Sequence, residues 1–156
     1  MTDNILISIE NMIGGYGAET IINDISFQIK KGDFLGIIGP NGSGKSTLLK
    51  LMSRVLIPQK GRALIEGEDI RHMDLKKLSQ KLAFVPQDTL VNFSFTVEEI
   101  VLMGRIPHLR RMQQETKKDY AIVERSMELT DTTALRNKNI DELSAGERQR
   151  AIIARA

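Results

Sequence analysis

The sequence predicts an α/β fold followed by a helical part, on three observations. A glycine-rich loop joins an apolar run to a stretch with helical spacing, which makes a strand–loop–helix unit. Several short β-branched runs lie on either side of that unit. After about residue 95 the apolar residues recur only at helical spacing. We therefore expect one domain, with a mixed sheet and helices in residues 1–95 and an α-helical subdomain in residues 96–156.

Three strands are predicted ahead of the glycine-rich loop. Residues 5–9 form a β-branched run that is followed by turn residues at 14–17. Residues 21–29 read as a second strand that ends in the turn at 30–33. Residues 34–38 are apolar without interruption, which is typical of a buried central strand.

The order of elements continues on the other side of the loop. A helix is expected to begin near Lys45, and Pro58 stops its pattern. Residues 61–66 predict a strand and residues 75–81 a short helix. Residues 82–85 predict a further buried strand.

The second part predicts helices at residues 96–103, 115–129 and 144–156. Their predicted N-caps are hydroxyl side chains of the kind that caps helix N-termini, namely Thr96, Thr116 and Ser144. Residues 104–112 contain a proline and three arginines and are the most loop-like segment of this part.

The composition excludes several classes of protein. Lys plus Arg number 22 against 20 Asp plus Glu, a net charge of +2, so we expect no nucleic-acid partner. There is no cysteine, which excludes disulfide scaffolds and thiolate chemistry and agrees with a cytoplasmic protein. The two histidines cannot form a multi-histidine metal site. No apolar run reaches the roughly 20 residues of a membrane span, and the N-terminus lacks the features of a secretory signal.

The glycine-rich loop carries the strongest functional signal. Its sequence GPNGSGKST fits G-x-x-x-x-G-K-[ST] between a predicted strand and a predicted helix, where a phosphate-binding loop belongs. Backbone N–H groups would surround phosphate oxygens, Lys45 would contact the β- and γ-phosphates, and the Ser46 hydroxyl would ligate Mg²⁺. The nucleotide-binding residues of this phosphate loop are Gly39, Pro40, Asn41, Gly42, Ser43, Gly44, Lys45, Ser46 and Thr47.

A GTP-binding switch protein is the first alternative, and the sequence argues against it. Guanine recognition requires N-K-x-D, but the acid after Asn137 and Lys138 comes one position late, at Asp141. The only D-x-x-G near the loop begins at Asp33 and precedes it, whereas the switch motif should follow.

The chain resembles the ATP-binding subunits of ATP-binding cassette (ABC) transporters over essentially its whole length. Tyr16 lies where that family places an aromatic that stacks on adenine. Residues 25–27 and 31–33 resemble the approach to the family's first core strand, and residues 39–47 match its phosphate loop almost letter for letter. The resemblance implies ATP and Mg²⁺ as cofactors.

Two later motifs extend the resemblance. Residues 84–87 are similar to the glutamine loop of the family, so Gln87 is implied as a catalytic residue beside Lys45, touching Mg²⁺ and the attacking water. Residues 143–150, LSAGERQR, resemble the signature motif, which closes over the γ-phosphate of ATP held by a second subunit. The signature residues implied for this contact in trans are Ser144, Ala145, Gly146 and Glu147.

The signature segment, residues 143–150, has a second interpretation and two departures from the family. Ser144 and Glu147 also fit a capping box, with which any helix could begin; one serine can serve both purposes. Position 145 is Ala where Gly is usual, and position 147 is Glu where Gln is usual. The Glu brings a negative charge near a triphosphate unless Arg148 or the local geometry turns it away.

Residues 96–99 and 104–108 are similar to the segment after the glutamine loop in importers of iron-siderophore, haem and cobalamin type. His108 in this segment is expected to be an ordinary loop histidine and not a metal ligand. The resemblance implies a membrane permease that contacts residues 87–112, a second ATP-binding subunit paired head to tail, and indirectly a substrate-binding protein. The protein would then be peripheral on the cytoplasmic side of the membrane.

The sequence stops in good helical pattern at Ala156. The family pattern continues to an apolar strand ending in Asp-Glu and later to a histidine, so the chain is expected to be cut short. Residues 1–156 alone should bind nucleotide weakly and hydrolyse it negligibly. The first interpretation is the ATP-hydrolysing subunit of a membrane importer; a non-transport ATP-dependent switch of the same fold and an inactive nucleotide-binding fragment stay open.

Overall fold

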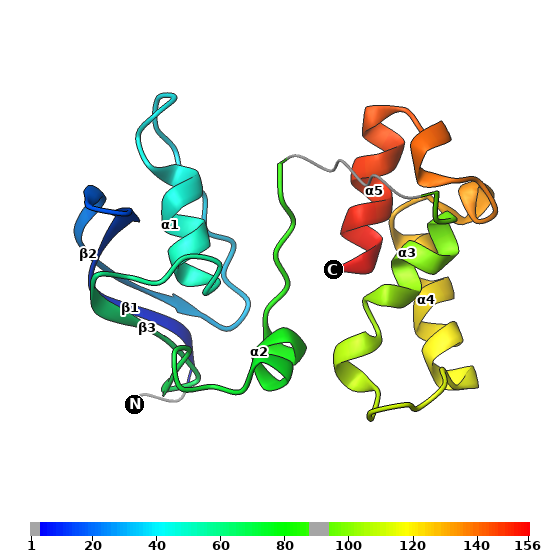
Figure 1. Ribbon diagram of the computed structural model, residues 1–156, viewed down its shortest axis with the longest axis horizontal. Coiled ribbons are helices and arrows are strands. Elements are labelled where there is room, and N and C mark those ends of the chain that lie inside the picture. The colour runs from blue at the N-terminus through cyan, green and yellow to red at the C-terminus, as the bar shows by residue number, and fades with distance from the viewer. Residues whose placement is uncertain (1–3, 88–93) are drawn as a thin grey trace. The chain divides into compact units, whose positions relative to one another are not determined.

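The computed structural model describes residues 4–87 and 94–156. The chain divides into two compact units, Met1–Leu78 and Ser79–Ala156, each with its own internal contacts (Figure 1). The change of composition in the sequence lies further along, near residue 95. Each unit is described by itself.

The first unit is built on a four-stranded sheet in the order β2-β1-β3-β4. Figure 1 shows β1 lying between β2 and β3. Its strands are β1 (Ile5–Tyr16), β2 (Glu19–Lys30), β3 (Lys60–Ile65) and β4 (Glu68–Asp69). All three pairings are antiparallel, and β1 and β2 form a long hairpin. The strands predicted at 21–29 and 61–66 are confirmed, whereas β1 runs through the turn predicted at 14–17 and ends at Tyr16.

Helix α1 (Lys45–Met52) packs on this sheet. Its buried residues are Thr47, Leu48 and Leu51. A Cβ added to Gly14 of β1 would lie 2.8 Å from a methyl carbon of Leu51, so the helix rests directly on the strand at a position that only glycine fills. Helix α2 (Leu75–Lys81) was predicted with the same bounds.

Two predicted strands are wrong. Residues 34–38 and 82–85 have no strand structure, and Phe34 and Ile38 are 100% and 97% exposed. A strand forms only when a neighbour accepts and donates its backbone hydrogen bonds, and no described strand pairs with either segment. The predicted burial of both runs is wrong as well, since none of their residues is buried. Apolar character alone does not supply a pairing partner.

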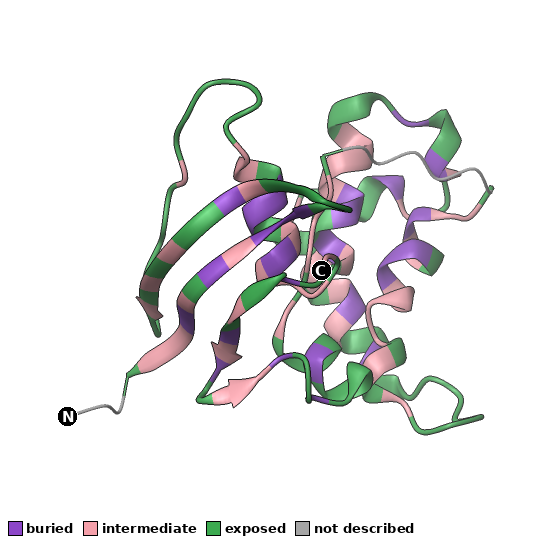
Figure 2. Cartoon of the chain, turned by 60° about the vertical axis from the view of Figure 1, so that its left-hand side comes forward, coloured by how far each residue is buried: buried purple, intermediate pink, exposed green. Residues whose placement is uncertain are grey.

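The second unit is helical. It contains α3 (Val97–Met103), α4 (Lys117–Leu129) and α5 (Ala145–Arg155), with short 3₁₀ turns at Ile106–His108, Thr133–Leu135 and Ile140–Glu142. Buried side chains from all three α-helices form one hydrophobic core, which includes Ile100, Val123, Met127 and Ile152. Figure 2 shows buried positions, in purple, recurring along the helices. No helix among the described residues is long and apolar enough to cross a membrane.

The predicted N-caps of the three helices are confirmed by full capping boxes. Thr96, Thr116 and Ser144 each accept a hydrogen bond from the backbone N–H three residues on. In each box the acid at that third position accepts a bond back from the cap's own N–H. The sequence therefore fixes where these helices begin.

One ion pair ties two of these helices together. Arg105, just after α3, donates to the buried carboxylate of Asp119 in the first turn of α4 at 3.0 Å. Hydrogen bonds from the hydroxyl and N–H of Thr116, and then the Arg105 guanidinium, lower the pKa of Asp119 from its usual 3.8 to about 2. The carboxylate thus closes a capping box and anchors the loop after α3 at once.

Candidate nucleotide-binding site

The phosphate loop runs from residue 39 into the first turn of α1. Gly42 and Gly44 have φ angles of +81° and +87°, which side chains other than glycine seldom adopt. A Cβ on Gly39 would lie 2.7 Å from the Ser43 hydroxyl, and one on Gly44 2.9 Å from the side chains of Ile21 and Ile22. The loop backbone is therefore shaped by glycines at conformations and distances that exclude other residues.

Lys45 lies at the start of α1 and reaches back over the loop. Its ammonium group donates to the carbonyl oxygens of Gly39 at 2.8 Å and Pro40 at 2.7 Å. Both partners are neutral, and the described residues pair no carboxylate with this ammonium. An incoming phosphate would replace two neutral acceptors by anionic ones, which form stronger hydrogen bonds with an ammonium.

Ser46 and Thr47, the two residues after Lys45, differ in their exposure. Ser46 is exposed in the first turn of α1, so its hydroxyl is open to a ligand at the N-terminal end of the helix. Thr47 is buried against the sheet. A hydroxyl oxygen is a ligand type that Mg²⁺ accepts, so Ser46 fits the ion and Thr47 serves packing.

Tyr16 ends β1 and lies beside α1. Lys50 donates to the Tyr16 hydroxyl at 3.1 Å, and its ammonium nitrogen is 5.5 Å from the ring centroid. The hydrogen bond from Lys50, and then one from Thr47, lowers the pKa of Tyr16 below its usual 10.0. The side chain is 46% exposed, which leaves ring surface for a base. Sequence reasoning missed Lys50, because nothing in the sequence shows which strand end lies against α1.

The remaining predicted site residues belong to the second unit. Gln87 is exposed at the end of residues 82–87, directly before residues outside the described range. Ser144 and Glu147 form the capping box of α5, with the Ser144 hydroxyl 2.6 Å from the Glu147 carboxylate. Ala145 and Gly146 are exposed, and a Cβ on Gly146 would meet nothing within 4 Å.

The structure thus assembles the predicted residues into two groups. Tyr16 and the phosphate loop gather around α1 in the first unit, while Gln87 and the signature residues lie in the second. His108 is exposed in the 3₁₀ turn after α3, and the described residues hold no group of three or more His, Cys, Asp or Glu that could bind a metal ion.

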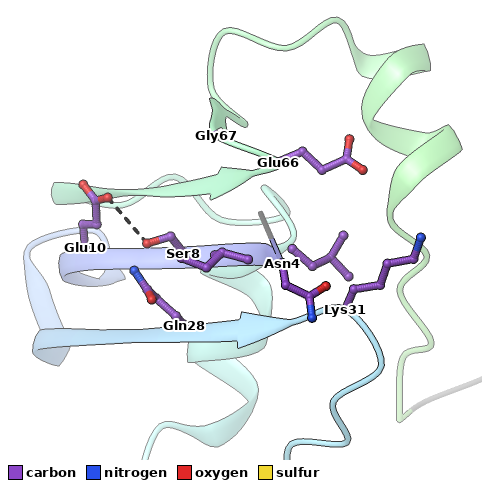
Figure 3. Close-up of a pocket in the computed structure, with 9 residues that line it drawn as sticks. Asn4, Ser8, Glu10, Gln28, Lys31, Glu66 and Gly67 are labelled. Atoms are coloured by element: carbon purple, nitrogen blue, oxygen red, sulfur yellow. Dashed lines mark hydrogen bonds between the residues drawn. The ribbon is translucent and has the colours of Figure 1, made fainter. Parts of the chain in front are cut away.

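A separate cavity of about 540 Å³ lies on the sheet of the first unit (Figure 3). Polar side chains of β1, β2 and the loop after β3 line it, among them Ser8, Glu10, Gln28 and Glu66. Glu10 is paired with Arg62 at 2.7 Å. None of the predicted site residues lines this cavity, so it is distinct from the phosphate loop.

Comparison with known proteins agrees with the class of protein that the phosphate loop and signature segment define. The family model described as ABC transporter matches residues 22–156. The chain belongs to the ABC transporter ATP-binding family.

Two curated relatives show how much of such a protein is present. The cobalamin import ATP-binding protein of Halobacterium salinarum is 41% identical over 136 residues, covering 87% of this chain and 34% of the relative. The ferric enterobactin transport ATP-binding protein of Escherichia coli is 38% identical over 145 residues, covering 93% of this chain and 54% of the relative. The chain therefore spans about a third to a half of the length of these relatives.

Solved structures show the same fold. A bacterial ABC transporter cassette, described as dimeric, superposes with a TM-score of 0.80 at 25% identity, covering 96% of this chain and 68% of the cassette. The expected ABC ATPase fold is confirmed, and the chain spans about two thirds of that cassette.

Proposed function

We propose that this chain is the nucleotide-binding part of an ATP-hydrolysing subunit that powers a membrane importer of metal chelates. The observation that carries the proposal is the ammonium of Lys45, held at the mouth of a glycine-shaped loop by two neutral carbonyl oxygens. A cation in this place, beside the N-terminus of α1, favours an anion of phosphate type.

In the first unit each residue has a separate task. The backbone N–H groups of residues 41–47 hold the phosphates, and Lys45 exchanges its carbonyl partners for β- and γ-phosphate oxygens. Tyr16 stacks on the adenine. Ser46 holds Mg²⁺, which, when bound, neutralises charge on the transferred phosphate group.

The second unit contributes residues that are assigned by family membership. Gln87 would orient the attacking water and touch Mg²⁺. Ser144, Ala145, Gly146 and Glu147 would contact the γ-phosphate of ATP bound by a second ATP-binding subunit. A head-to-tail pair of this kind agrees with the dimeric description of the similar cassette.

The cargo and partners follow from the relatives. Their names include cobalamin import and ferric enterobactin transport, so an iron-siderophore, haem or cobalamin-like chelate is the proposed substrate. A permease, and indirectly a substrate-binding protein, would complete the importer, with this subunit peripheral on the cytoplasmic side. Residues 1–95 and 96–156 would act as nucleotide core and helical subdomain of one domain.

Transport tests this function directly. The whole ATP-binding subunit of which this chain is proposed to be part would be co-expressed with candidate permeases and reconstituted into vesicles with ATP on the side of the subunit. We expect ATP-dependent movement of a labelled metal chelate, lost with Lys45→Ala. ATP hydrolysis without a co-purifying permease or any chelate movement would contradict the importer and support a non-transport switch.

A further inference from the structure

The contact between Lys50 and Tyr16 joins two elements that are far apart in sequence. Lys50 Nζ is 3.1 Å from the Tyr16 hydroxyl and 5.5 Å from the ring centroid. The ammonium is therefore nearer the hydroxyl edge of the ring than its centre. A lysine that holds a tyrosine by its hydroxyl leaves ring surface open, and Tyr16 is 46% exposed.

The backbone around this pair is fixed on both sides. One residue before the tyrosine lies Gly15, where a Cβ would come within 1.9 Å of the Glu19 carbonyl oxygen, so the hairpin is tight. One residue after Lys50, Leu51 is fully buried and packs on Gly14 of the same strand. The packing of their neighbours thus fixes the backbone positions of Lys50 and Tyr16 next to each other.

The face of α1 that contacts Tyr16 includes Thr47, the last residue of the phosphate loop. Thr47 and Lys50 are three residues apart and share one face of α1. Lys45 is five residues before Lys50, about 7.5 Å along the helix axis. The ring is therefore held beside the helix whose N-terminus faces the phosphates.

We propose that Lys50 is a positioning residue for base binding: it holds the Tyr16 ring in the orientation in which the nucleobase stacks. This inference rests on the proposed ATP binding. An unheld tyrosine would lose rotamer freedom when a base binds, and Lys50 removes that cost beforehand. Lys50 is not proposed to touch the phosphates.

The test separates the base from the phosphates. Binding of ATP and of inorganic tripolyphosphate, each with Mg²⁺, would be titrated calorimetrically to the full chain and its variants. Lys50→Met should weaken ATP binding by about three- to tenfold, the range of one typical intramolecular hydrogen bond, and leave tripolyphosphate binding unchanged. Tyr16→Phe removes only the hydroxyl and should give a similar loss. The double variant should lose no more than either single variant.

Controls distinguish this inference from general charge effects and from the proposed function. Lys31→Met removes one exposed positive charge from the same unit and should change neither affinity. An equal loss of ATP and tripolyphosphate binding in Lys50→Met would overturn the inference, because Lys50 would then act on phosphates. Unchanged ATP binding in Lys50→Met would overturn it as well. Neither result overturns the proposed ATP binding, provided that Lys45→Ala abolishes the binding of ATP. Unchanged ATP binding in Lys45→Ala would overturn the proposed function itself.

Discussion

The carboxylate of Glu147 accepts two hydrogen bonds from Ser144, from its backbone N–H at 2.9 Å and from its hydroxyl at 2.6 Å. The Ser144 hydroxyl oxygen accepts the Glu147 N–H at 3.4 Å in return. The acid that replaces the usual glutamine is thus folded back onto the cap of α5. The capping box, treated as an alternative from the sequence, is present. The Ser144 hydroxyl donates its one proton to Glu147, so its proposed contact with a phosphate requires that bond to be exchanged.

The hydrogen bonds of this cap should contribute to the stability of the folded chain. Ser144→Ala removes the hydroxyl that accepts from the helix and should lower the free energy of unfolding by about 1 kcal/mol. Thermal or urea unfolding measures the change. Ser126→Ala, inside α4, is the matched control and should be near neutral, because alanine favours a helix interior. Equal losses in both variants would contradict a special role for the cap.

A second prediction concerns pH. The pKa of Asp119 is lowered from 3.8 to about 2, so the unfolded chain binds the extra proton first as the pH falls. The stabilisation by this carboxylate should be complete above pH 3.8 and disappear as the pH falls through about 2. The melting temperature of Asp119→Asn should therefore lie a few degrees below that of the unchanged protein at pH 7, and the gap should close in acid.

The control for that measurement is Asp131→Asn. Asp131 is exposed at a φ of +52°, which asparagine tolerates. This variant should follow the unchanged protein across the pH range. A gap for Asp119→Asn that stays constant down to pH 2 would show that the ionised carboxylate, with its bonds from Thr116 and Arg105, is not the cause.

Two glycines of the helical unit should respond in opposite ways to alanine. A Cβ at Gly104 would lie 2.1 Å from the Arg155 carbonyl oxygen, so Gly104→Ala should destabilise by about 1–3 kcal/mol. At Gly146 the Cβ meets nothing within 4 Å, and alanine inside the helix should stabilise by about 0.5–1 kcal/mol. If the signature segment closes on phosphate, Gly146→Ala introduced into the whole ATP-binding subunit should nevertheless slow ATP hydrolysis. Unchanged hydrolysis in a folded Gly146→Ala protein would contradict that contact.

The glycines of the phosphate loop offer a similar pair. Gly42 and Gly44 both have φ near +80 to +90°, but only the Cβ of Gly44 would touch other side chains, those of Ile21 and Ile22. Gly44→Ala should therefore lower both stability and ATP affinity, and by more than Gly42→Ala, which strains the backbone alone. Unfolding curves and ATP titrations of the two variants would check the order; the reverse order would contradict the loop geometry.

The first residues of the helices in the second unit could be predicted from the sequence, because a capping box is a local signal. Thr96, Thr116 and Ser144 each carry it within four residues. The strands predicted at 34–38 and 82–85 failed because strand formation depends on a partner elsewhere in the chain. An apolar run does not contain the identity of the neighbour that would pair with it and bury it.

The candidate site shows the same division. The phosphate loop could be predicted from the sequence, because phosphate binding requires these residue types at this spacing. The Lys50 contact to Tyr16 was not, since it depends on how β1 and α1 pack through Gly14 and Leu51. Long-range packing of this kind leaves no spacing rule in the sequence.

The central claim is that residues 39–47 bind the phosphates of ATP through Lys45, and calorimetric titration of MgATP into the full chain tests it most directly. Saturable binding that weakens at least tenfold in Lys45→Ala and is unchanged in Lys31→Met is the result predicted here. Lys45 bonds only to loop carbonyls in the described structure, so its removal should leave the melting temperature nearly unchanged. ATP binding that is equally strong in a folded Lys45→Ala protein would contradict the account.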